Sequence, residues 1–361
     1  MKLLENFSYW RKNFQWPKIQ QWRQIFNVSS RKEKIIFSLF CLTFFTGFLL
    51  LSVWSYLFFT EEKPTYGGKI SLGLLGAPRF FNPVLVQIGD VDQEICSIIF
   101  SGLMKYNGQG ELVNDLVEKY NIEEEGKVYN IVLKSNVKWH DGQPLNADDI
   151  IFTIRTIQNS DFRSPLRSLW QGIETEKIDD LTIRLKLKKS FAGFLSSLTF
   201  GILPKHLWEN VDANRFALSE QNLKAIGSGP FKIKSLQKDA SGKITALELA
   251  AFDDYFLGRP YLDKINISFY PSEEEMWLAY KKNNLDVFSF ISAKNWHELA
   301  EKNSFNLNVY PIILPRYFAI FFNQEANKIL TEKNLRQALA YALDKKEIVK
   351  QVLGDFGQVV D

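Results

Sequence analysis

The chain has few of the residues that cross-link small secreted folds or bind metals. Its 361 residues include two cysteines and three histidines. Cys41 lies in an apolar run far from Cys96, so the sequence contains no disulfide framework and no zinc pattern. His140, His206 and His297 are scattered without metal-ligand spacing. The sequence therefore predicts neither a metal site nor a cofactor.

The net positive charge of the chain comes from its first residues alone. Residues 1–34 contain eight Lys or Arg and two Glu, a net charge of +6. Because the formal charge of the whole chain is +3, the remaining residues have a net charge of −3. Nucleic-acid-binding faces are basic, so the sequence gives no reason to expect a nucleic-acid partner for the main part of the chain.

One segment lacks charge altogether. Residues 35–59, IIFSLFCLTFFTGFLLLSVWSYLFF, would form a helix about 38 Å long, which exceeds the ~30 Å hydrocarbon core of a bilayer. The sequence therefore predicts a transmembrane helix over residues 35–59. The basic residues before it place residues 1–34, a Trp-rich segment, in the cytoplasm.

A cleaved signal peptide is the alternative to this anchor. The apolar run is long for a signal, 34 residues precede it, and no A-x-A site follows it. Cys41 also lacks the small preceding residue of a bacterial lipoprotein signal. We therefore expect a single-pass protein of the cell membrane, with the chain after residue 59 outside the cytoplasm, in the periplasm or at the cell surface.

Strand and helix patterns alternate after the apolar run. A capping box, Ser272-x-x-Glu275, precedes the apolar residues of one predicted helix, and a second is marked by Leu335, Leu339, Leu343 and Ile348. Alternating apolar and polar residues predict strands over 69–75, 128–134, 182–188, 244–252, 264–269 and 318–322. This order predicts an α/β fold with more than one lobe.

The stretch KWHDGQPLNADDIIFTI, residues 138–154, contains a His beside an Asp and then two adjacent Asp residues, which resemble an active site. The residues of this stretch also have local structural explanations: Trp139 ends a strand, Asp141-Gly142 forms a turn, and Asn146 caps a helix. Asp148 and Asp149 are adjacent in the first turn and point about 100° apart, so they do not converge on one atom. We predict a structural unit without catalytic residues, and a protein that is not an enzyme.

The same stretch resembles the strand–turn–helix signature of the family 5 extracellular solute-binding proteins, the peptide- and nickel-binding receptors of ABC importers. Further segments are similar to that family in the same order, and the whole resemblance covers about residues 67–357. These segments are GGKISLGLLGAPRFFNPVL (67–85), LMKYNGQGELVNDLVEKYNI (103–122), AIGSGPFKIKS (225–235), FDDYFLGRPYLDKINISFYPSEEEMWLAYKKNNLDV (252–287) and FFNQEANKILTEKNLRQALAYALDKKEIVKQVLG (321–354).

The resemblance implies a periplasmic-binding-protein-like fold of type II, with two lobes around a cleft that closes by a hinge. Residues 65–270 would form the first lobe, with a smaller subdomain at about 100–175, and residues 271–361 would begin the second. Family members continue well past a helix ending near Leu353. We therefore expect an incomplete second lobe, as in a truncated gene, a split gene or a fragment.

The implied function is a membrane-anchored receptor that captures peptides and delivers them to the permease of an ABC importer. An envelope sensor or scaffold that uses the same fold without transport is the alternative. The sequence does not decide between peptides of different lengths, nickel or another solute as the ligand.

The resemblance also implies where a ligand would bind. Gln87, Ile88, Gly89 and Asp90 would contact the ligand backbone, although an ordinary polar loop fits the same residues. Leu166 and Trp170 would line the cleft from the smaller subdomain, although a core position fits each equally well. Glu273 aligns with a cleft-facing acid of oligopeptide binders, and its alternative is a charge in the first turn of a helix.

Overall fold

The structure, a computed structural model, describes residues 18, 24, 27–61, 63–86, 91–289, 292, 318–353 and 357–360. It divides into two compact units, Met1–Thr65 and Tyr66–Asp361. Most of the predicted cytoplasmic segment, residues 1–34, lies outside the described residues.

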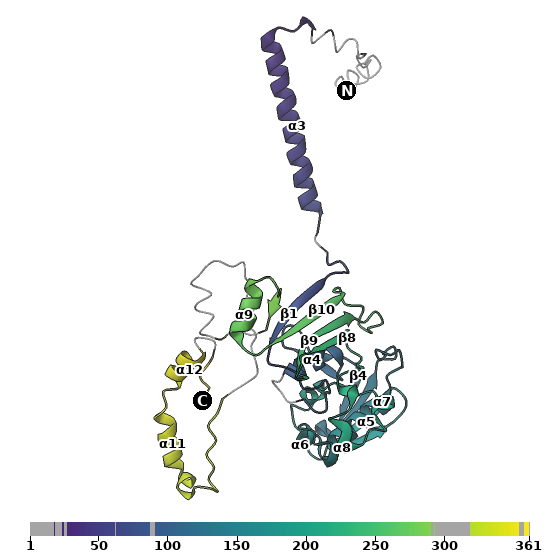
Figure 1. The fold of residues 1–361 in the computed structure, drawn as a ribbon, viewed down its shortest axis with the longest axis vertical. Helices are drawn as coiled ribbons and strands as arrows, with labels where there is room; N and C mark the ends of the chain where they lie inside the picture. The colour runs from purple at the N-terminus through teal and green to yellow at the C-terminus, as the bar shows by residue number, and fades with distance from the viewer. Residues whose placement is uncertain are drawn as a thin grey trace, which may run out of the picture. The chain divides into compact units, whose positions relative to one another are not determined.

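The first unit contains one long helix, α3 (Arg31–Phe59), of 29 residues (Figure 1). It begins at Arg31 rather than at the predicted Ile35, because Ser30 and Glu33 form a capping box upstream of the apolar run. The Ser30 backbone N–H donates to the Glu33 carboxylate at 2.7 Å. At about 44 Å, the helix is long and apolar enough to cross a membrane.

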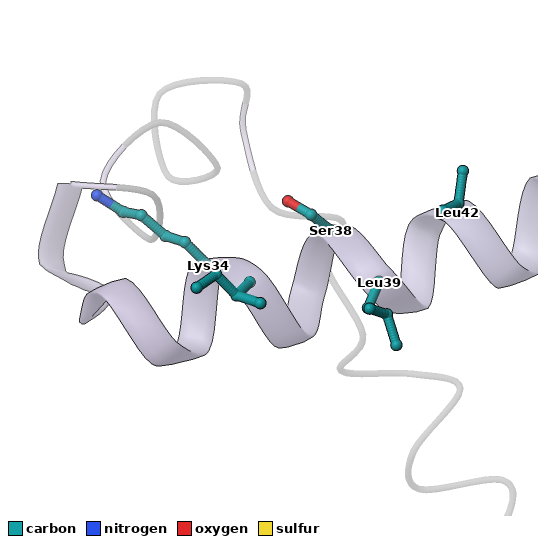
Figure 2. A pocket seen from close by; sticks show the side chains of 5 residues that line it. Lys34, Ser38, Leu39 and Leu42 are labelled. Atoms are coloured by element: carbon teal, nitrogen blue, oxygen red, sulfur yellow. The ribbon is translucent and has the colours of Figure 1, made fainter.

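A shallow pocket lies on one side of α3, lined by Lys34, Ile35, Ser38, Leu39 and Leu42. These residues follow helical spacing along a single helix, so the hollow is the space between neighbouring side chains. Figure 2 shows Lys34 extending toward the start of the helix, away from Leu39 and Leu42. A lysine at a membrane boundary extends in the same way to bring its ammonium group to water.

The second unit is built on a five-stranded sheet of order β11-β1-β10-β9-β8 (Figure 1). β1 pairs in parallel with β10 and with β11, whereas β10–β9 and β9–β8 are antiparallel. The strands are β1 (Lys69–Leu75), β8 (Phe231–Lys238), β9 (Ile244–Ala251), β10 (Lys264–Tyr270) and β11 (Val287–Phe288). β1 has the bounds predicted from the sequence, and β9 and β10 differ from theirs by one residue.

A smaller antiparallel sheet of order β4-β5-β7-β6 lies between β1 and β8 in the sequence, and β2 and β3 form a separate pair. Its members are β4 (Val117–Glu123), β5 (Val128–Leu133), β6 (Glu174–Lys177) and β7 (Thr182–Lys186), and the pair consists of β2 (Met104–Tyr106) and β3 (Leu112–Asn114). In β5 and β7, buried apolar residues alternate with less buried ones, as the predicted half-buried strands require.

Helices cover these sheets and close the main core. The core is one contiguous cluster that includes residues of α4, α5 and both larger sheets, and a second small cluster lies under α9. The helices are α4 (Val91–Ile99), α5 (Ala147–Gln158), α6 (Arg167–Trp170), α7 (Lys205–Trp208), α8 (Ala213–Phe216) and α9 (Glu273–Lys281). The Ser272 hydroxyl caps α9 by accepting from the Glu275 N–H at 3.2 Å, as predicted.

The stretch 138–154 forms the predicted turn and helix, but not the predicted strand end. Asn146 caps α5 in a full capping box with Asp149, and Gly142 has a positive φ of 89° in the turn.

The prediction that Trp139 ends a strand is wrong. β5 ends at Leu133, and only an isolated bridge joins Lys138 to Pro144. Trp139 is instead a fully buried core residue in an irregular segment.

The C-terminal part contains α11 (Lys333–Tyr341) and α12 (Lys345–Leu353), neither of which has a buried residue. The sequence marked one helix here, whereas the chain forms two with Leu343 between them. The predicted strand over residues 318–322 is wrong, because those residues are irregular. An alternating apolar pattern makes a strand only where another strand supplies hydrogen-bond partners.

Candidate ligand-binding site

The segment that follows β1 leads into the first predicted part of the ligand site. Gln87, Ile88, Gly89 and Asp90 lie outside the described residues, but the chain on both sides of them is described. On the near side Val84 and Val86 are buried, and on the far side the chain resumes at Val91, the first residue of α4. Both attachments of the predicted ligand loop, defined as residues 87–90, are therefore built into the core.

A buried polar cluster holds the near side. Asn82 is 0% exposed, and its side-chain oxygen accepts from the Val84 N–H at 3.0 Å. Its side-chain amide donates to Asn222 Oδ1 at 3.0 Å, and Asn222 in turn donates to the Phe216 carbonyl at 2.6 Å. Because buried amides are costly without partners, this network specifies one conformation for the turn before the loop.

The segment that contains Leu166 is attached to the same turn. The Ser164 hydroxyl donates to the Val84 carbonyl at 2.6 Å and accepts from the Leu166 N–H at 3.3 Å. Leu166 is half-buried and packs against the main core. The structure therefore ties the segment that contains Leu166 to the turn at Val84. A contact of Leu166 with a ligand stays a prediction.

On the far side, α4 is fastened by a buried carboxylate. Asp92 is 2% exposed and accepts from the Arg79 backbone N–H at 2.7 Å. The Arg79 Nε atom lies 3.4 Å from the other carboxylate oxygen. Burial raises the pKa of Asp92, and the hydrogen bonds and positive charge of Arg79 partly oppose that rise. The first turn of α4 is thus tied to the segment that leaves β1.

Replacing Asp92 by alanine is expected to destabilise the protein by about 2 kcal/mol, because the partly buried Arg79 N–H loses a charged acceptor. Asp92→Asn keeps one acceptor oxygen and should retain more than half of that stability. Glu94→Ala, an exposed change on the same helix, is the matched control and should change stability by no more than about 0.5 kcal/mol. Thermal unfolding of the three variants measures the effect, and equal losses for Asp92→Ala and Glu94→Ala would contradict it.

Trp170, at the end of α6, has the core position that was its alternative. Its side chain is 0% exposed and packs at 5.0 Å against Phe200 and 5.8 Å against Phe194, between ring centroids. Its Nε1 atom has no hydrogen-bond partner among the described residues. In this arrangement Trp170 presents no surface to a ligand, so a ligand-lining role for it stays a prediction.

Glu273 begins α9, away from the other candidates in the sequence and on a different element. It is half-buried, and its Oε1 atom accepts from the Ser292 backbone N–H at 2.8 Å. Such a bond fixes the chain after β11 to the start of α9. Glu273 therefore has a described structural partner, and its contact with a ligand stays a prediction.

The acidic residues of the 138–154 stretch have separate structural partners. Asp148 is paired with Lys177 at 2.7 Å, and the hydrogen bond from Lys177 lowers the pKa of Asp148. Asp149 is buried and accepts from the backbone N–H groups of Asn146 and Lys205 at 3.0 and 2.8 Å. The two carboxylates point to different elements, so their geometry does not form an acid–base pair.

Sequence reasoning missed the residues that hold this site in place. Asn82, Ser164 and Asp92 are ordinary polar residues in turns or at a helix start, and their partners are distant in the chain. The signal that could have drawn attention to them is polarity inside otherwise apolar segments, such as Asp92 before the buried Ile95 and Ile99 of α4.

These features define the class of the fold: an α/β protein in which a mixed five-stranded sheet and a smaller antiparallel sheet contribute to one core. Residues 111–361 match the sequence profile of the bacterial extracellular solute-binding proteins, family 5, middle region. The oligopeptide-binding protein AppA of Bacillus subtilis is 33% identical over 301 residues, which is 82% of this chain and 54% of AppA. The dipeptide-binding protein of Escherichia coli is 28% identical over 300 residues, 77% of this chain and 54% of that protein.

Solved structures agree with the sequence comparisons. AppA from Bacillus subtilis in complex with a nonapeptide matches with a TM-score of 0.69 and 32% identity, over 82% of this chain and 58% of AppA. NikZ from Campylobacter jejuni in complex with Ni(L-His) matches with a TM-score of 0.68 and 27% identity, over 83% of this chain and 57% of NikZ. The chain belongs to family 5 of the bacterial extracellular solute-binding proteins, and it spans about half the length of the curated relatives it matches.

Proposed function

We propose that the protein containing this chain is a membrane-anchored, extracytoplasmic receptor that captures peptides and delivers them to the permease of an ABC importer. The observation that supports this most directly is the 33% identity, over 82% of the chain, to an oligopeptide-binding protein. The chain would supply one wall of the ligand cleft, with the predicted ligand loop and Leu166 at its surface.

The buried flanks of the loop support a backbone-reading mechanism. A receptor that accepts many peptide sequences binds what they share, the main chain, and leaves room and water for the side chains. Gly89 would allow close approach of the ligand backbone, with Gln87, Ile88 and Asp90 beside it. The flanking residues Val84 and Asp92 are already held by hydrogen bonds, so they would lose little further conformational entropy on ligand binding, which favours affinity.

The described part of α3 supports the membrane anchor. Its apolar side chains are exposed along the helix, and a hydrocarbon phase would cover them. Basic residues before α3 would keep residues 1–34 in the cytoplasm and the binding region outside it.

Isothermal titration of the gene product that contains residues 1–361, held in lipid nanodiscs, tests the proposal. Di- to pentapeptides should bind with dissociation constants in the micromolar range or tighter. Ni(L-His) and small sugars are the comparison ligands. Binding heat with these ligands and none with peptides would indicate a receptor for another solute. Absence of binding heat with every one of these ligands would contradict a receptor role.

A sensor or scaffold is the second candidate, and the basic segment with Trp10, Trp16 and Trp22 favours it. An importer receptor engages its permease outside the membrane, so deletion of residues 1–24 should leave peptide uptake unchanged. A sensor that signals through this segment would lose its output while its peptide binding remained intact.

A further inference from the structure

Two exposed tyrosines stack on each other where the chain enters the second unit. Tyr66 is 65% exposed and Tyr261 is 51% exposed, and their ring centroids lie 5.0 Å apart. The Arg259 guanidinium lies over the Tyr66 ring, 5.5 Å from its centroid. Even with these contacts, more than half of each tyrosine stays open to its surroundings.

Backbone hydrogen bonds fasten this aromatic pair to the start of the five-stranded sheet. The Gly67 N–H donates to the Tyr261 carbonyl at 2.8 Å, and the Asp263 N–H donates to the Gly68 carbonyl at 3.1 Å. Gly67 and Gly68 have positive φ values of 131° and 81°, which glycine adopts at low cost. Because β1 begins immediately afterwards at Lys69, the pair is held by the sheet rather than by a loose loop.

The charged groups beside the pair leave no excess of positive charge. Arg259 Nε lies 2.7 Å from an Asp253 carboxylate oxygen, and the same guanidinium also pairs with Asp263. One cation faces two carboxylates in this cluster, so it does not attract an anionic partner. The exposed surface is aromatic with phenolic hydroxyls, which suits a boundary that is apolar on one side and wet on the other.

The linker after α3 is short enough to bring this pair to a membrane surface. α3 ends at Phe59, and residues 60–65 connect it to Tyr66. At about 44 Å, α3 exceeds the ~30 Å hydrocarbon core, so its end can lie in the outer headgroup layer. From Phe59 an extended chain reaches Tyr66 over at most about 25 Å. Tyrosine and tryptophan are enriched in the headgroup layer, and Trp54 and Tyr56 near the end of α3 are exposed residues of the same kind.

We propose that Tyr66 and Tyr261 form a membrane seat: their exposed surfaces contact the outer headgroup layer of the bilayer that α3 crosses, and they hold the amino-terminal end of β1 at that layer. This inference rests on the proposed function, since it takes α3 as the membrane anchor and the second unit as extracytoplasmic. A receptor seated in this way moves less freely on its linker, so it presents fewer orientations to a permease in the same membrane.

Quenching of a fluorescent label by lipids with nitroxide headgroups tests the seat in the gene product held in nanodiscs. The label is attached at Lys69→Cys or at Lys243→Cys, in a Cys41→Ser background in which Cys96 is buried. Lys69 begins β1 and Lys243 precedes β9, and the strand pairing puts them at opposite ends of the five-stranded sheet. Because about 24 Å of strand separates these ends, quenching at Lys69 should be at least about twice that at Lys243. Equal quenching at the two positions overturns the inference, and this comparison leaves both tyrosines in place.

Substitution of the tyrosines provides the second test, because the linker alone also keeps Lys69 close to the bilayer. In the protein labelled at Lys69, Tyr66→Ser combined with Tyr261→Ser should lower quenching to about half or less, whereas phenylalanine at both positions keeps the rings and should retain most of it. Tyr106→Ser is the matched control, since Tyr106 on β2 is 55% exposed, and quenching should not change. Thermal unfolding checks that each variant is folded. Quenching that is the same with and without the two tyrosines overturns the seat.

Lipid charge distinguishes an aromatic seat from an electrostatic contact. Because the Arg259 cluster has no excess of positive charge, quenching at Lys69 should agree within about twofold between phosphatidylcholine nanodiscs and nanodiscs that also contain phosphatidylglycerol, and it should persist at about 0.5 M salt, where exposed charges are screened. Loss of the quenching in neutral lipid or at high salt overturns the aromatic seat.

Titration of the unaltered protein with pentaalanine separates this inference from the proposed function. Peptide binding together with quenching that does not depend on the tyrosines overturns the seat and leaves the receptor function standing. Tyrosine-dependent quenching without binding of any peptide overturns the receptor function and leaves the seat standing. A gene product that does not insert into nanodiscs overturns the membrane anchor and the seat together.

Discussion

Replacing Gly227 by alanine is expected to destabilise the protein by about 3 kcal/mol or more. The new Cβ atom would lie 2.0 Å from the Ile99 carbonyl oxygen and 2.7 Å from its carbon. Both atoms belong to the backbone at the end of α4, so no side-chain rotation relieves the overlap. Either α4 moves or residues 227–229 separate from it, and the two hydrogen bonds between Gly227 and His140 are strained in both cases.

Gly108→Ala is the matched control for this substitution. Gly108 lies in a turn without a positive φ, and an added Cβ would meet nothing within 4 Å. Its stability should stay within about 0.5 kcal/mol of the unaltered protein. Thermal and urea unfolding followed by tryptophan fluorescence measures both variants. A Gly227→Ala variant as stable as Gly108→Ala would contradict the close contact between residues 227–229 and the end of α4.

Truncation of Trp170 to alanine is expected to cost about 3–5 kcal/mol, the range for large aromatic residues in a packed core. Its ring is fully buried between Phe194 and Phe200 and next to α5, so the surrounding core cannot collapse onto the space without moving several elements. Trp170→Phe should cost only about 1–2 kcal/mol, because it leaves a smaller cavity and breaks no described hydrogen bond.

The Trp170→Phe variant also separates the two interpretations of this residue. If Trp170 is a core residue, peptide affinity of the folded variant should match that of the unaltered protein. If it lines the ligand, affinity should fall while stability changes little. Isothermal titration at a temperature well below both unfolding midpoints distinguishes these outcomes.

Local features of the fold were predictable from sequence because their causes are local. The alternation in residues 69–75 gave the bounds of β1, and Asn146 with Asp149 marked the start of α5. The resemblance of several collinear segments led to the correct family. The predicted strand over residues 318–322 failed because a strand depends on a partner that periodicity does not reveal.

The site was less predictable, because its supports are contacts between distant residues. His140 was interpreted only as part of a turn, and its bonds to Gly227 and Gly229 join segments that share no local pattern. Asn82 meets Asn222 in the same way. Trp170 follows helical spacing that suits a cleft wall and a core equally, and only packing decides between them. Sequence patterns report which face of an element is apolar, but not what covers it.

The parallel pairing of β1 with β10 sets an order of events during synthesis. Lys69 pairs with Lys264, so β1 has left the ribosome long before its partner is made. At ordinary translation rates that delay is on the order of 10–40 s. The strands of the smaller sheet, from Val117 to Lys186, all emerge within that interval and can pair among themselves. We therefore expect the chain to fold from its middle outward as it reaches the outer side of the membrane, with β1 an unpaired apolar strand that a holding chaperone would protect.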